Sequence, residues 1–472
     1  IKQKFDDVQA ILGDKFIPSY PLFILGILQA LEYKPTNLNE TSFGYCYQAL
    51  ILYSLYRVGV TNDEIDTYFN FLTELAYEFI KRNKNTFNDQ ELHSFYQTYQ
   101  EKFITPPYEK IFGAIKKAKI LVTEMEEYKF GYNYLLYYLS AKKISDLLHT
   151  EIGKKIINEL FKNVHIEKNA SILVFIAHHS KDVSYIEESI LNAMLALENS
   201  TAITLNKNDP FYNSLYSFGK EITNDVLETN RNPKTQREQE LIFLDNEQRI
   251  KELNAEETFN EINEVAIPFY RAFRSIEIVG QIVKNRKGSL EKPQLLQMIE
   301  EIYTTGFRII AYTIDLLEST KINIIKAISE EIDSTTSRYE IEQKVNEFIQ
   351  INNLQVCLGV FIKLANSIGT KELKNIYVDA ANKLNTPAAR LVSFGINSYY
   401  GTISDKELIS LVKDFKDNHL ALNILRARVK SYVYNRDLDY KSKQRFASIL
   451  GMHTDTLKAF NKNNYPQDGL RI

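Results

Sequence analysis

The sequence predicts an all-α protein, and three observations support this prediction. Its 472 residues contain only 17 glycines and 11 prolines, so few positions interrupt a helix. Strict alternation of apolar and polar residues, the pattern of a half-buried strand, is scarce. Apolar residues instead recur at helical spacing, as in Ile172, Phe175 and Ile176, and again in Ile186, Ile190, Met194 and Leu197.

Helix start signals support the same prediction. In a capping box a hydroxyl accepts a hydrogen bond from an orphan amide of the first turn, and a glutamate three residues later reaches back to the cap residue. Four such pairs precede apolar runs: Thr61 with Glu64, Ser184 with Glu187, Ser337 with Glu340, and Ser404 with Glu407. We therefore expect four helices to begin at these pairs.

Length and composition limit the class of protein. A chain of 472 residues is too long for one core and predicts about two to four subdomains. Its 44% hydrophobic and 25% charged residues are typical of a folded soluble protein. The net charge of -3 gives no global attraction to nucleic acid or anionic lipid. Two distant cysteines, Cys46 and Cys357, predict a reduced, cytoplasmic protein without a disulfide.

Membrane and targeting segments are not predicted. The longest apolar runs, residues 20–31 and 49–60, are shorter than the roughly 18 to 20 residues that a bilayer crossing needs. The chain starts with Ile1 and has no basic region followed by a cleavage site. We therefore expect it to be a piece of a longer polypeptide, with any catalytic domain encoded upstream.

Five segments can be separated along the chain. Residues 1–60 and 61–145 are dense in aromatic residues, and residues 146–229 predict helical hairpins. Residues 230–264 are rich in charged and amide side chains and predict a solvated helix or a connector. In residues 265–472, helices of roughly 12 to 20 residues alternate with short polar breaks. That rhythm is typical of an α-solenoid, which presents an extended surface to a partner.

Motifs for catalysis are absent from the sequence. It contains no phosphate-binding loop, no dinucleotide-binding glycine motif, no H-E-x-x-H and no C-x-x-C. We therefore predict that this chain is not an enzyme. A site of an unfamiliar kind would require a buried polar cluster that includes His178 and Asp182 around a pocket.

The best candidate for a metal site is His178 and His179 with Asp182. Adjacent histidines on a helix diverge by about 100°, whereas zinc ligands on a helix are usually three or four residues apart. The prediction is therefore that there is no metal site. The favoured interpretation is a helix that ends at the histidines, where an imidazole interacts well with the negative end of the dipole, before a helix that starts near Ser184.

The most distinctive segment is residues 128–143, Y-K-F-G-Y-N-Y-L-L-Y-Y-L-S-A-K-K. Phe130, Tyr134, Tyr137, Tyr138 and Ala141 fall at steps of three and four residues and predict one aromatic stripe on a helix. A buried tyrosine hydroxyl needs a polar partner, so the stripe is expected to lie against polar groups of a neighbouring domain or a ligand. The alternative is an ordinary set of half-buried core aromatics.

Residues 130–141 are similar to the end of the winged-helix domain in NACHT-type and related STAND nucleotide-switch ATPases, which reads F-x-H-x-x-F-x-E-[FY]-x-x-A. Phe130, Leu135, Tyr138 and Ala141 agree with it in type. Tyr132 stands where the family often has its nucleotide-sensing histidine. Tyr137 replaces the family's acidic residue.

Residues 16–25, F-I-P-S-Y-P-L-F-I-L, resemble a second family feature, the proline that precedes an apolar helix in the helical domain. The resemblance implies that residues 1–60 form the helical domain after an absent NTPase core and that residues 61–145 form a winged-helix-like domain. It also implies that Pro21 contacts the base and Tyr132 the phosphates of a nucleotide. No cofactor is then expected in this chain alone, and ATP or ADP is expected in the full-length parent.

Residues 163–182 and 271–308 also resemble the C-terminal helical regions of bacterial members thought to act in phage defence. The function implied is a regulatory and ligand-sensing region, in which a protein partner, such as one derived from phage, binds residues 265–472 and shifts a nucleotide-dependent switch. Oligomerisation on activation is part of that expectation. The alternative is an α-solenoid scaffold for protein interactions with no nucleotide role.

Overall fold

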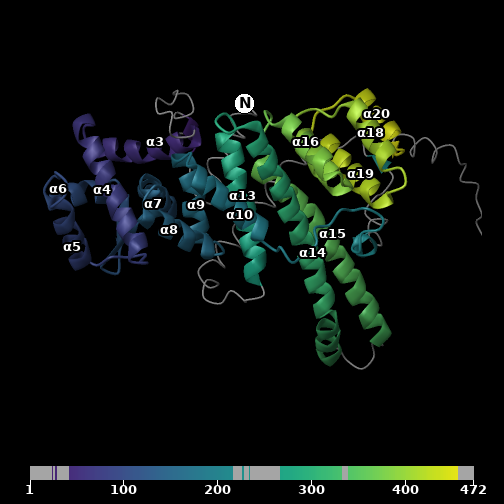
Figure 1. Cartoon of the computed structure of the whole chain (residues 1–472), viewed down its shortest axis with the longest axis horizontal. Coiled ribbons are helices and arrows are strands. Elements are labelled where there is room, and N and C mark those ends of the chain that lie inside the picture. Colours follow the sequence, from purple (N-terminus) through teal and green to yellow (C-terminus); the bar gives the residue numbers. More distant parts are fainter. Residues whose placement is uncertain are drawn as a thin grey trace, which may run out of the picture. The chain divides into compact units, whose positions relative to one another are not determined.

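The computed structural model of the chain describes residues 42–215, 266–331 and 338–454, together with Ile24, Ile27, Leu28, Val226, Leu227 and Pro233. Within these residues the fold is all-α, as predicted. Helices carry nearly all of the regular structure, and the strands are only two or four residues long (Figure 1). Apart from Pro233, the charged segment 230–264 lies outside the described residues.

The chain forms two compact units. Unit 1 comprises Ile1–Asn192 and Glu277–Leu290, and unit 2 comprises Ala193–Ile276 and Glu291–Ile472. The described elements of unit 1 are α3 (Ser42–Arg57), α4 (Asn62–Lys81), α5 (Asp89–Gln100), α6 (Tyr108–Lys117), β1 (Leu121–Glu124), β2 (Glu127–Phe130), α7 (Asn133–Leu147), α8 (Glu151–Lys162), α9 (Glu167–His179), most of α10 (Val183–Leu195) and the C-terminal part of α13 (Ile267–Arg286).

A small antiparallel sheet follows the first helices of unit 1. β1 and β2 pair from Leu121 with Phe130 to Glu124 with Glu127. The two-residue turn between them has both residues at positive φ, Met125 at 48° and Glu126 at 65°, the geometry of a type I′ turn that matches strand twist. Phe87, which precedes α5, forms an antiparallel bridge with Tyr128 and so adds a third extended segment beside β2.

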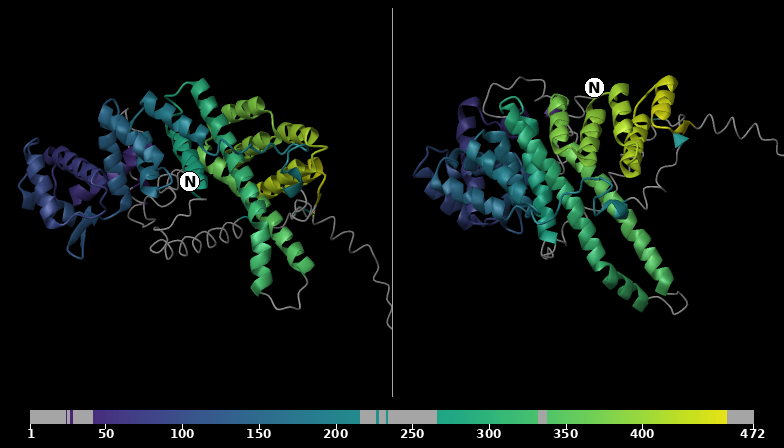
Figure 2. Two further views of the ribbon diagram at one scale, coloured as in Figure 1. Left: turned by 60° about the horizontal axis from the view of Figure 1, so that its bottom comes forward. Right: turned by 45° about the vertical axis from the view of Figure 1, so that its right-hand side comes forward.

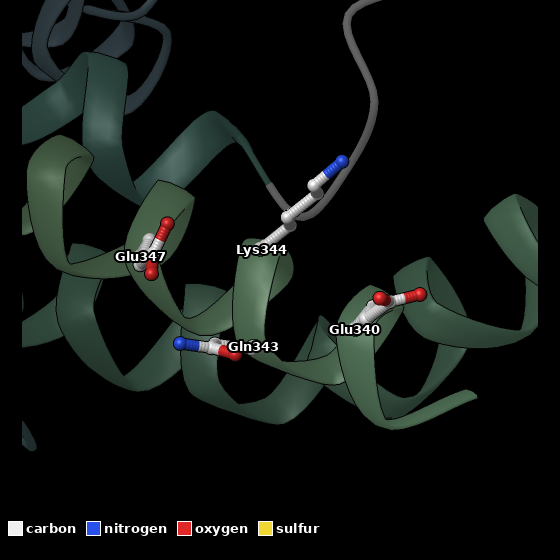
Figure 3. Close-up of a pocket in the computed structure, with 4 residues that line it drawn as sticks. All are labelled: Glu340, Gln343, Lys344 and Glu347. Carbon is white, nitrogen blue, oxygen red and sulfur yellow. The ribbon is translucent and has the colours of Figure 1, made fainter. Parts of the chain in front are cut away.

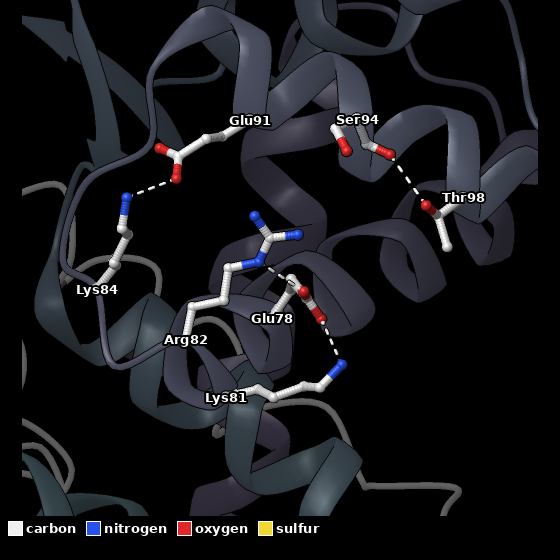
Figure 4. Close-up of polar contacts among 7 residues, drawn as sticks. All are labelled: Glu78, Lys81, Arg82, Lys84, Glu91, Ser94 and Thr98. Atoms are coloured by element: carbon white, nitrogen blue, oxygen red, sulfur yellow. Dashed lines mark hydrogen bonds and ion pairs between the residues drawn. The ribbon is translucent and has the colours of Figure 1, made fainter.

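The helix starts of unit 1 agree only in part with the predicted capping boxes. Thr61 is the cap residue of α4, but its hydroxyl contacts the Glu64 carboxylate and makes no cap bond to an amide. The complete capping box belongs to Asn88 and Glu91 at the start of α5, where both reciprocal bonds are present. Figure 4 shows that Glu91 also pairs with Lys84, beside the end of α4, where Glu78 pairs with Arg82 and Lys81.

The core of unit 1 is arranged around α7. This helix packs on α4, α8 and α9, and α9 also packs on α3. Most of α9 is buried, from Ala170 to His179, which explains why its sequence is apolar on all sides. The aromatic residues between 42 and 145 therefore serve mainly as core, with Phe71, for example, in edge-to-face contact with Phe95, Tyr99 and Phe112.

Unit 2 consists mainly of antiparallel helices that pack in alternation. α14 packs on α15 and on α16, α15 packs on α17, α17 packs on α19, and α18 packs on α20 (Figure 2). These helices are α14 (Lys292–Glu331), α15 (Arg338–Ile368), α16 (Lys374–Leu384), α17 (Pro387–Tyr400), α18 (Asp405–Asp414), α19 (His419–Tyr434) and α20 (Tyr440–Ile449), and a short parallel pair joins β3 (Val226–Leu227) to β4 (His453–Thr454).

An extended segment before the helices of unit 2 binds three of them. The backbone amide of Ile203 donates to Phe307 of α14, and the carbonyl of Thr204 accepts from Ala388 of α17. The Asn418 side chain, at the start of α19, donates to the carbonyl of Leu205 at 2.7 Å. Ile203 and Leu205 are buried, so this segment belongs to the core of unit 2.

The longest helices of unit 2 form a hairpin that carries its own small core. Ile341, Val345 and Ile349 of α15 are buried against apolar residues of α14, including Leu317 and Ile325. Within α15, Tyr339–Ile368 is long and apolar enough to cross a membrane by length and composition, and 44% of its most apolar window is buried. A core helix of a soluble protein passes the same test. The packing of α15 on α14 and α17 accounts for its apolar composition.

Candidate functional site

The structure describes one of the two residues predicted to contact nucleotide. Pro21 lies outside the described residues. Tyr132 is described and stands at the junction of β2 and α7 as the cap residue of α7, in an extended conformation with φ -142° and ψ 141°. Its ring is half-buried and lies 6.0 Å from that of Tyr134, with the planes 24° apart. The junction therefore fixes the position of the phenol at the start of a helix.

Gly131 makes this junction tight. Its amide donates to the carbonyl of Ile120 at 2.8 Å. A Cβ at this position would lie 2.3 Å from the carbonyl oxygen of Lys119, a backbone atom with little freedom to move. Glycine is therefore required between Phe130 and Tyr132, because any side chain would push the end of β2 away from the turn after α6.

The aromatic stripe of residues 130–141 faces the core of unit 1. Tyr134, Tyr138 and Ala141 are buried on α7, whereas Tyr137 is only half-buried. Burial raises the pKa of Tyr137 to about 12, with the negative charge of Glu167 as a further cause. The hydroxyl of Tyr138 donates to the carbonyl of Gly44 in α3 at 3.2 Å. The expected polar partner of this buried tyrosine is thus a backbone carbonyl of the same unit.

Histidines from the end of α9 pack against this stripe. The Nε2 atom of His179 lies 3.1 Å from the carbonyl oxygen of Tyr138, and the two rings are 4.4 Å apart. The ring of His178 is 5.8 Å from that of Tyr47, which in turn contacts Tyr138 and Phe175. α9 ends at His179, which agrees with the interpretation of this pair as a helix C-terminus.

Burial determines the protonation of His178. Only 2% of this residue is exposed. Burial lowers the pKa of His178 to about 3, and the positive charges of His179 and Arg286 act in the same direction. His178 is therefore neutral at physiological pH. A neutral imidazole packed among aromatic rings serves as a core residue and not as a general acid.

Arg286, which is distant in sequence, binds the end of α9 beside these histidines. Its Nε donates to the carbonyl of Ala177 at 2.9 Å and its Nη2 to the carbonyl of His178 at 2.7 Å. These carbonyls belong to the last turn of α9, where no amide of the helix donates to them. The guanidinium, only 3% exposed, therefore caps α9 and ties the end of α13 to it.

Asp182 does not join the histidine pair. Its Oδ1 accepts from the amide of Tyr185 at 2.9 Å and from the hydroxyl of Ser184, and its Oδ2 lies 3.3 Å from Nδ1 of His149. Burial opposes ionisation of this carboxyl, but the hydrogen bonds from Ser184 and Tyr185 outweigh it and hold its pKa below the usual range. The prediction that Ser184 caps the next helix is therefore wrong, because Asp182 occupies that role.

Two further observations concern metal clusters and a surface depression in the described residues. In residues 42–215, 266–331 and 338–454, no group of three or more histidine, cysteine, aspartate or glutamate residues could hold a metal. A shallow depression of about 380 Å³ is lined by Glu340, Gln343, Lys344 and Glu347. Figure 3 shows that all four side chains project from α15, so the depression is a solvated helix face.

Comparison with known proteins identifies no relative. No family model, no curated protein and no solved structure matches the chain.

Proposed function

We propose that this chain is the regulatory and ligand-sensing region of a STAND-type signalling NTPase in antiphage defence. In this proposal residues 61–145 form its winged-helix domain and residues 265–472 an α-solenoid sensor. Binding of a protein partner to the solenoid shifts a nucleotide-dependent equilibrium in the full-length parent. The chain itself carries no catalytic role, and the parent is a cytoplasmic protein that assembles when activated.

The order of elements between Asn62 and Phe130 carries this proposal. A helix, a bridging residue, two helices and a β-hairpin follow one another as α4, Phe87, α5, α6 and β1–β2. A winged helix consists of three helices and a small antiparallel sheet whose hairpin forms the wing. The bridge between Phe87 and Tyr128 supports this assignment most strongly, because it places a third segment of sheet between the first two helices in sequence.

The burial of residues 130–141 is a second support. The four positions that agree in type with the family pattern, Phe130, Leu135, Tyr138 and Ala141, are all buried. Tyr137, which replaces the family's acidic residue, is only half-buried. If the family pattern served only to form a hydrophobic core, it would not include an acidic residue at the half-buried position that Tyr137 occupies here.

Tyr132 has the position that a nucleotide contact requires in this proposal. It stands at the start of α7, where the positive end of the helix dipole favours an anionic group. A phenol can donate one hydrogen bond to a phosphate oxygen, but it is neutral at pH 7 and cannot supply the charge of an imidazolium. The contact would therefore be weaker than in members with histidine. Pro21 would contribute apolar contact with the base.

The helices of unit 2 suit the role of a sensor. Alternate helices stack, with α15 on α17 and α17 on α19, which is the packing that generates a solenoid surface. The hairpin of α14 and α15 displays Ile322, Tyr339 and Phe348, which are 76%, 74% and 55% exposed. Large exposed apolar side chains of this kind favour protein association.

The same surface also favours the alternative function, an α-solenoid scaffold for protein interactions without a nucleotide role. Both functions predict a protein partner on unit 2. They differ in what precedes residue 1 in the gene. The scaffold predicts coding sequence without a phosphate-binding loop, whereas the nucleotide switch predicts a P-loop ATPase core directly upstream.

The nucleotide role can be tested in the full-length protein. Purified wild-type protein should retain ADP, measured by chromatography after denaturation. Tyr132→Phe removes the one hydrogen bond that the phenol can donate, so ADP affinity should fall by about tenfold, the equivalent of about 1.4 kcal/mol. Pro21→Ala should weaken binding through lost contact with the base.

Two further variants serve as controls. Tyr132→His restores the residue expected in the family and should retain ADP at least as well as wild type. Tyr53→Phe alters a tyrosine of α3 that is 47% exposed and should leave ADP content unchanged. If Tyr132→Phe and Pro21→Ala both retain ADP like Tyr53→Phe, the nucleotide contacts are wrong and the scaffold function is favoured.

A further inference from the structure

The hairpin of α14 and α15 has an inner half that is anchored in unit 2. Phe307 of α14 is buried, and its ring lies 6.1 Å from that of Phe361 of α15. The carbonyl of Phe307 also accepts from the amide of Ile203, in the extended segment that belongs to the core of unit 2. In the same half, α14 packs on α16 and α15 packs on α17. The inner half is therefore held by several other elements of unit 2.

The outer half of this hairpin, residues 315–329 of α14 and 339–349 of α15, is much less buried. None of residues 315–329 is fully buried, and within residues 339–349 only Ile341, Val345 and Ile349 are. These three residues pack against partly buried residues of α14, namely Leu317, Ile324, Ile325 and Ile328. Figures 1 and 2 both show the two helices extending together beyond the shorter helices of unit 2. The small core of the outer half is thus formed by its own two helices.

A buried asparagine lies at the boundary between the two halves. Asn353 of α15 is fully buried, and within the described residues neither its Oδ1 nor its Nδ2 has a hydrogen-bond partner. It follows Ile349 by four residues and precedes Cys357, which is also buried, by four. Residues at this spacing are neighbours on a helix surface, so Asn353 interrupts the apolar face of α15 between the outer and the inner core.

The buried amide of Asn353 favours opening of the outer half. In the closed hairpin the amide is removed from water without a partner, which destabilises the folded arrangement at this position. When the outer helices separate, water can hydrate the amide. The apolar burial that is lost at the same time is small, because only three fully buried side chains belong to the outer core. Segments with few buried apolar contacts open at a lower free energy than the domain that carries them.

We propose that the outer half of the α14–α15 hairpin opens as a separate cooperative unit, with Asn353 as the weak point at its base. Opening exposes the apolar face that carries Ile341, Val345 and Ile349, while the inner half stays folded on the rest of unit 2. This conformational device is independent of the nucleotide role of Tyr132.

Hydrogen exchange of the full chain under native conditions, followed by mass spectrometry of peptic fragments, tests this opening. Amides of residues 317–328 and 341–349 should have protection factors at least about 100-fold lower than amides near Phe307 and Phe361. They should also share one protection factor, because a cooperative unit opens as a whole. Equal protection in the two halves would overturn the proposal. A gradual decline toward the ends of the two helices, without a common value, would indicate fraying and would overturn it as well.

Asn353→Leu tests the role of the buried amide, because leucine is similar in size and needs no hydrogen bond. Protection of the outer half should rise by about tenfold, the equivalent of about 1.4 kcal/mol. Asn352→Leu is the matched control, since Asn352 is only half-buried and its Nδ2 donates to the carbonyl of Phe348 at 2.7 Å. This variant makes the same change in helix propensity and should alter protection by less than about threefold.

The two variants decide whether Asn353 is the weak point. If Asn353→Leu raises the protection of the outer half no more than Asn352→Leu does, or lowers it, the amide is satisfied in the folded hairpin and the proposed role of Asn353 is wrong. The comparison of the inner and outer halves in wild-type protein decides whether the outer half opens separately, even if Asn353→Leu fails to fold.

Discussion

Arg286 and His178 are 108 residues apart in sequence, yet Nη2 of the arginine donates to the backbone carbonyl of the histidine at 2.7 Å. Together with the bond from Nε to Ala177, this contact caps the C-terminus of α9 with a buried positive charge. The cap satisfies carbonyls that helix geometry leaves without a partner. It also places the cation where the helix dipole is negative.

Replacement of Arg286 by methionine should therefore destabilise unit 1. The change leaves two buried carbonyls without a donor, and we expect a loss of about 1–3 kcal/mol in the free energy of unfolding. Urea denaturation followed by circular dichroism gives the magnitude, and hydrogen exchange of α9 amides localises it. Arg390→Met, in which an exposed pair with Asp414 is lost, should change stability by less than about 0.5 kcal/mol. Equal stability of the two variants would contradict the capping role.

Alanine substitutions at two glycines are expected to change the stability of the fold in opposite directions. Gly131→Ala would place a methyl group 2.3 Å from the carbonyl oxygen of Lys119, so the hairpin must move and stability should fall by about 2 kcal/mol or more. Gly113, inside α6, has no atom within 4 Å of its Cβ position. Gly113→Ala should raise stability by about 0.5–1 kcal/mol, because alanine restricts the unfolded chain and favours the helix. Thermal unfolding of both variants checks the pair, and a stabilised Gly131→Ala would show that the junction is not tight.

The fold class could be predicted from local signals, because the apolar periodicity that specifies a helix lies within a few residues. Thr61 and Ser404 are indeed the cap residues of α4 and α18, although neither side chain makes a cap bond. A pattern limited to hydroxyl residues does not include Asn88, which forms a complete capping box. The pair of Ser184 and Glu187 predicts that α10 starts at Ser184, but the carboxylate of Asp182 accepts the first-turn amide instead. Ser337, the fourth candidate, lies outside the described residues.

The arrangement of the candidate site could be predicted only in part. Spacing placed Tyr134, Tyr138 and Ala141 on one face of a helix, and these residues are buried together. That face contacts the ring of Tyr47, and Arg286 caps the end of α9, the helix that packs on it; no local pattern connects either residue to the stripe. Arg286 stands in the polar break after Lys284, a composition typical of a solvated turn, and only tertiary packing buries it.

Asp209 should hold the extended segment of unit 2 in place. Its Oδ2 accepts from the amide of Thr204 at 2.6 Å, from the Thr204 hydroxyl at 2.8 Å and from the amide of Leu205 at 3.2 Å. Its Oδ1 accepts from the amide of Phe211 at 3.0 Å. These bonds support Leu205 at a φ of 60°, a conformation that leucine rarely adopts.

Asp209→Ala removes all four acceptor contacts and should lower the free energy of unfolding by about 2–4 kcal/mol. Hydrogen exchange should show faster exchange at Ile203 and Ala388, whose amides depend on the position of the segment. Asp437→Ala, at an exposed position after α19, is the matched control and should have little effect on either measurement. Unchanged exchange at these two amides in Asp209→Ala would exclude the proposed support.

The depressed pKa of His178, about 3 in the folded state, should make unit 1 sensitive to acid. An unfolded histidine has a pKa near 6.5, so between pH 6.5 and 3 the unfolded state binds a proton that the folded state does not. Stability from this group is thus complete above pH 6.5 and is lost as the pH falls, by about 1.4 kcal/mol per pH unit. Urea denaturation at pH 7.5, 6.5 and 5.5, with hydrogen exchange of α9 amides, should reveal this slope. His178→Leu cannot take up the proton and should lose that part of the slope, whereas His93→Asn, at an exposed position of α5, should retain it. Identical slopes in wild type and His178→Leu would mean that the buried imidazole does not govern the acid sensitivity of unit 1.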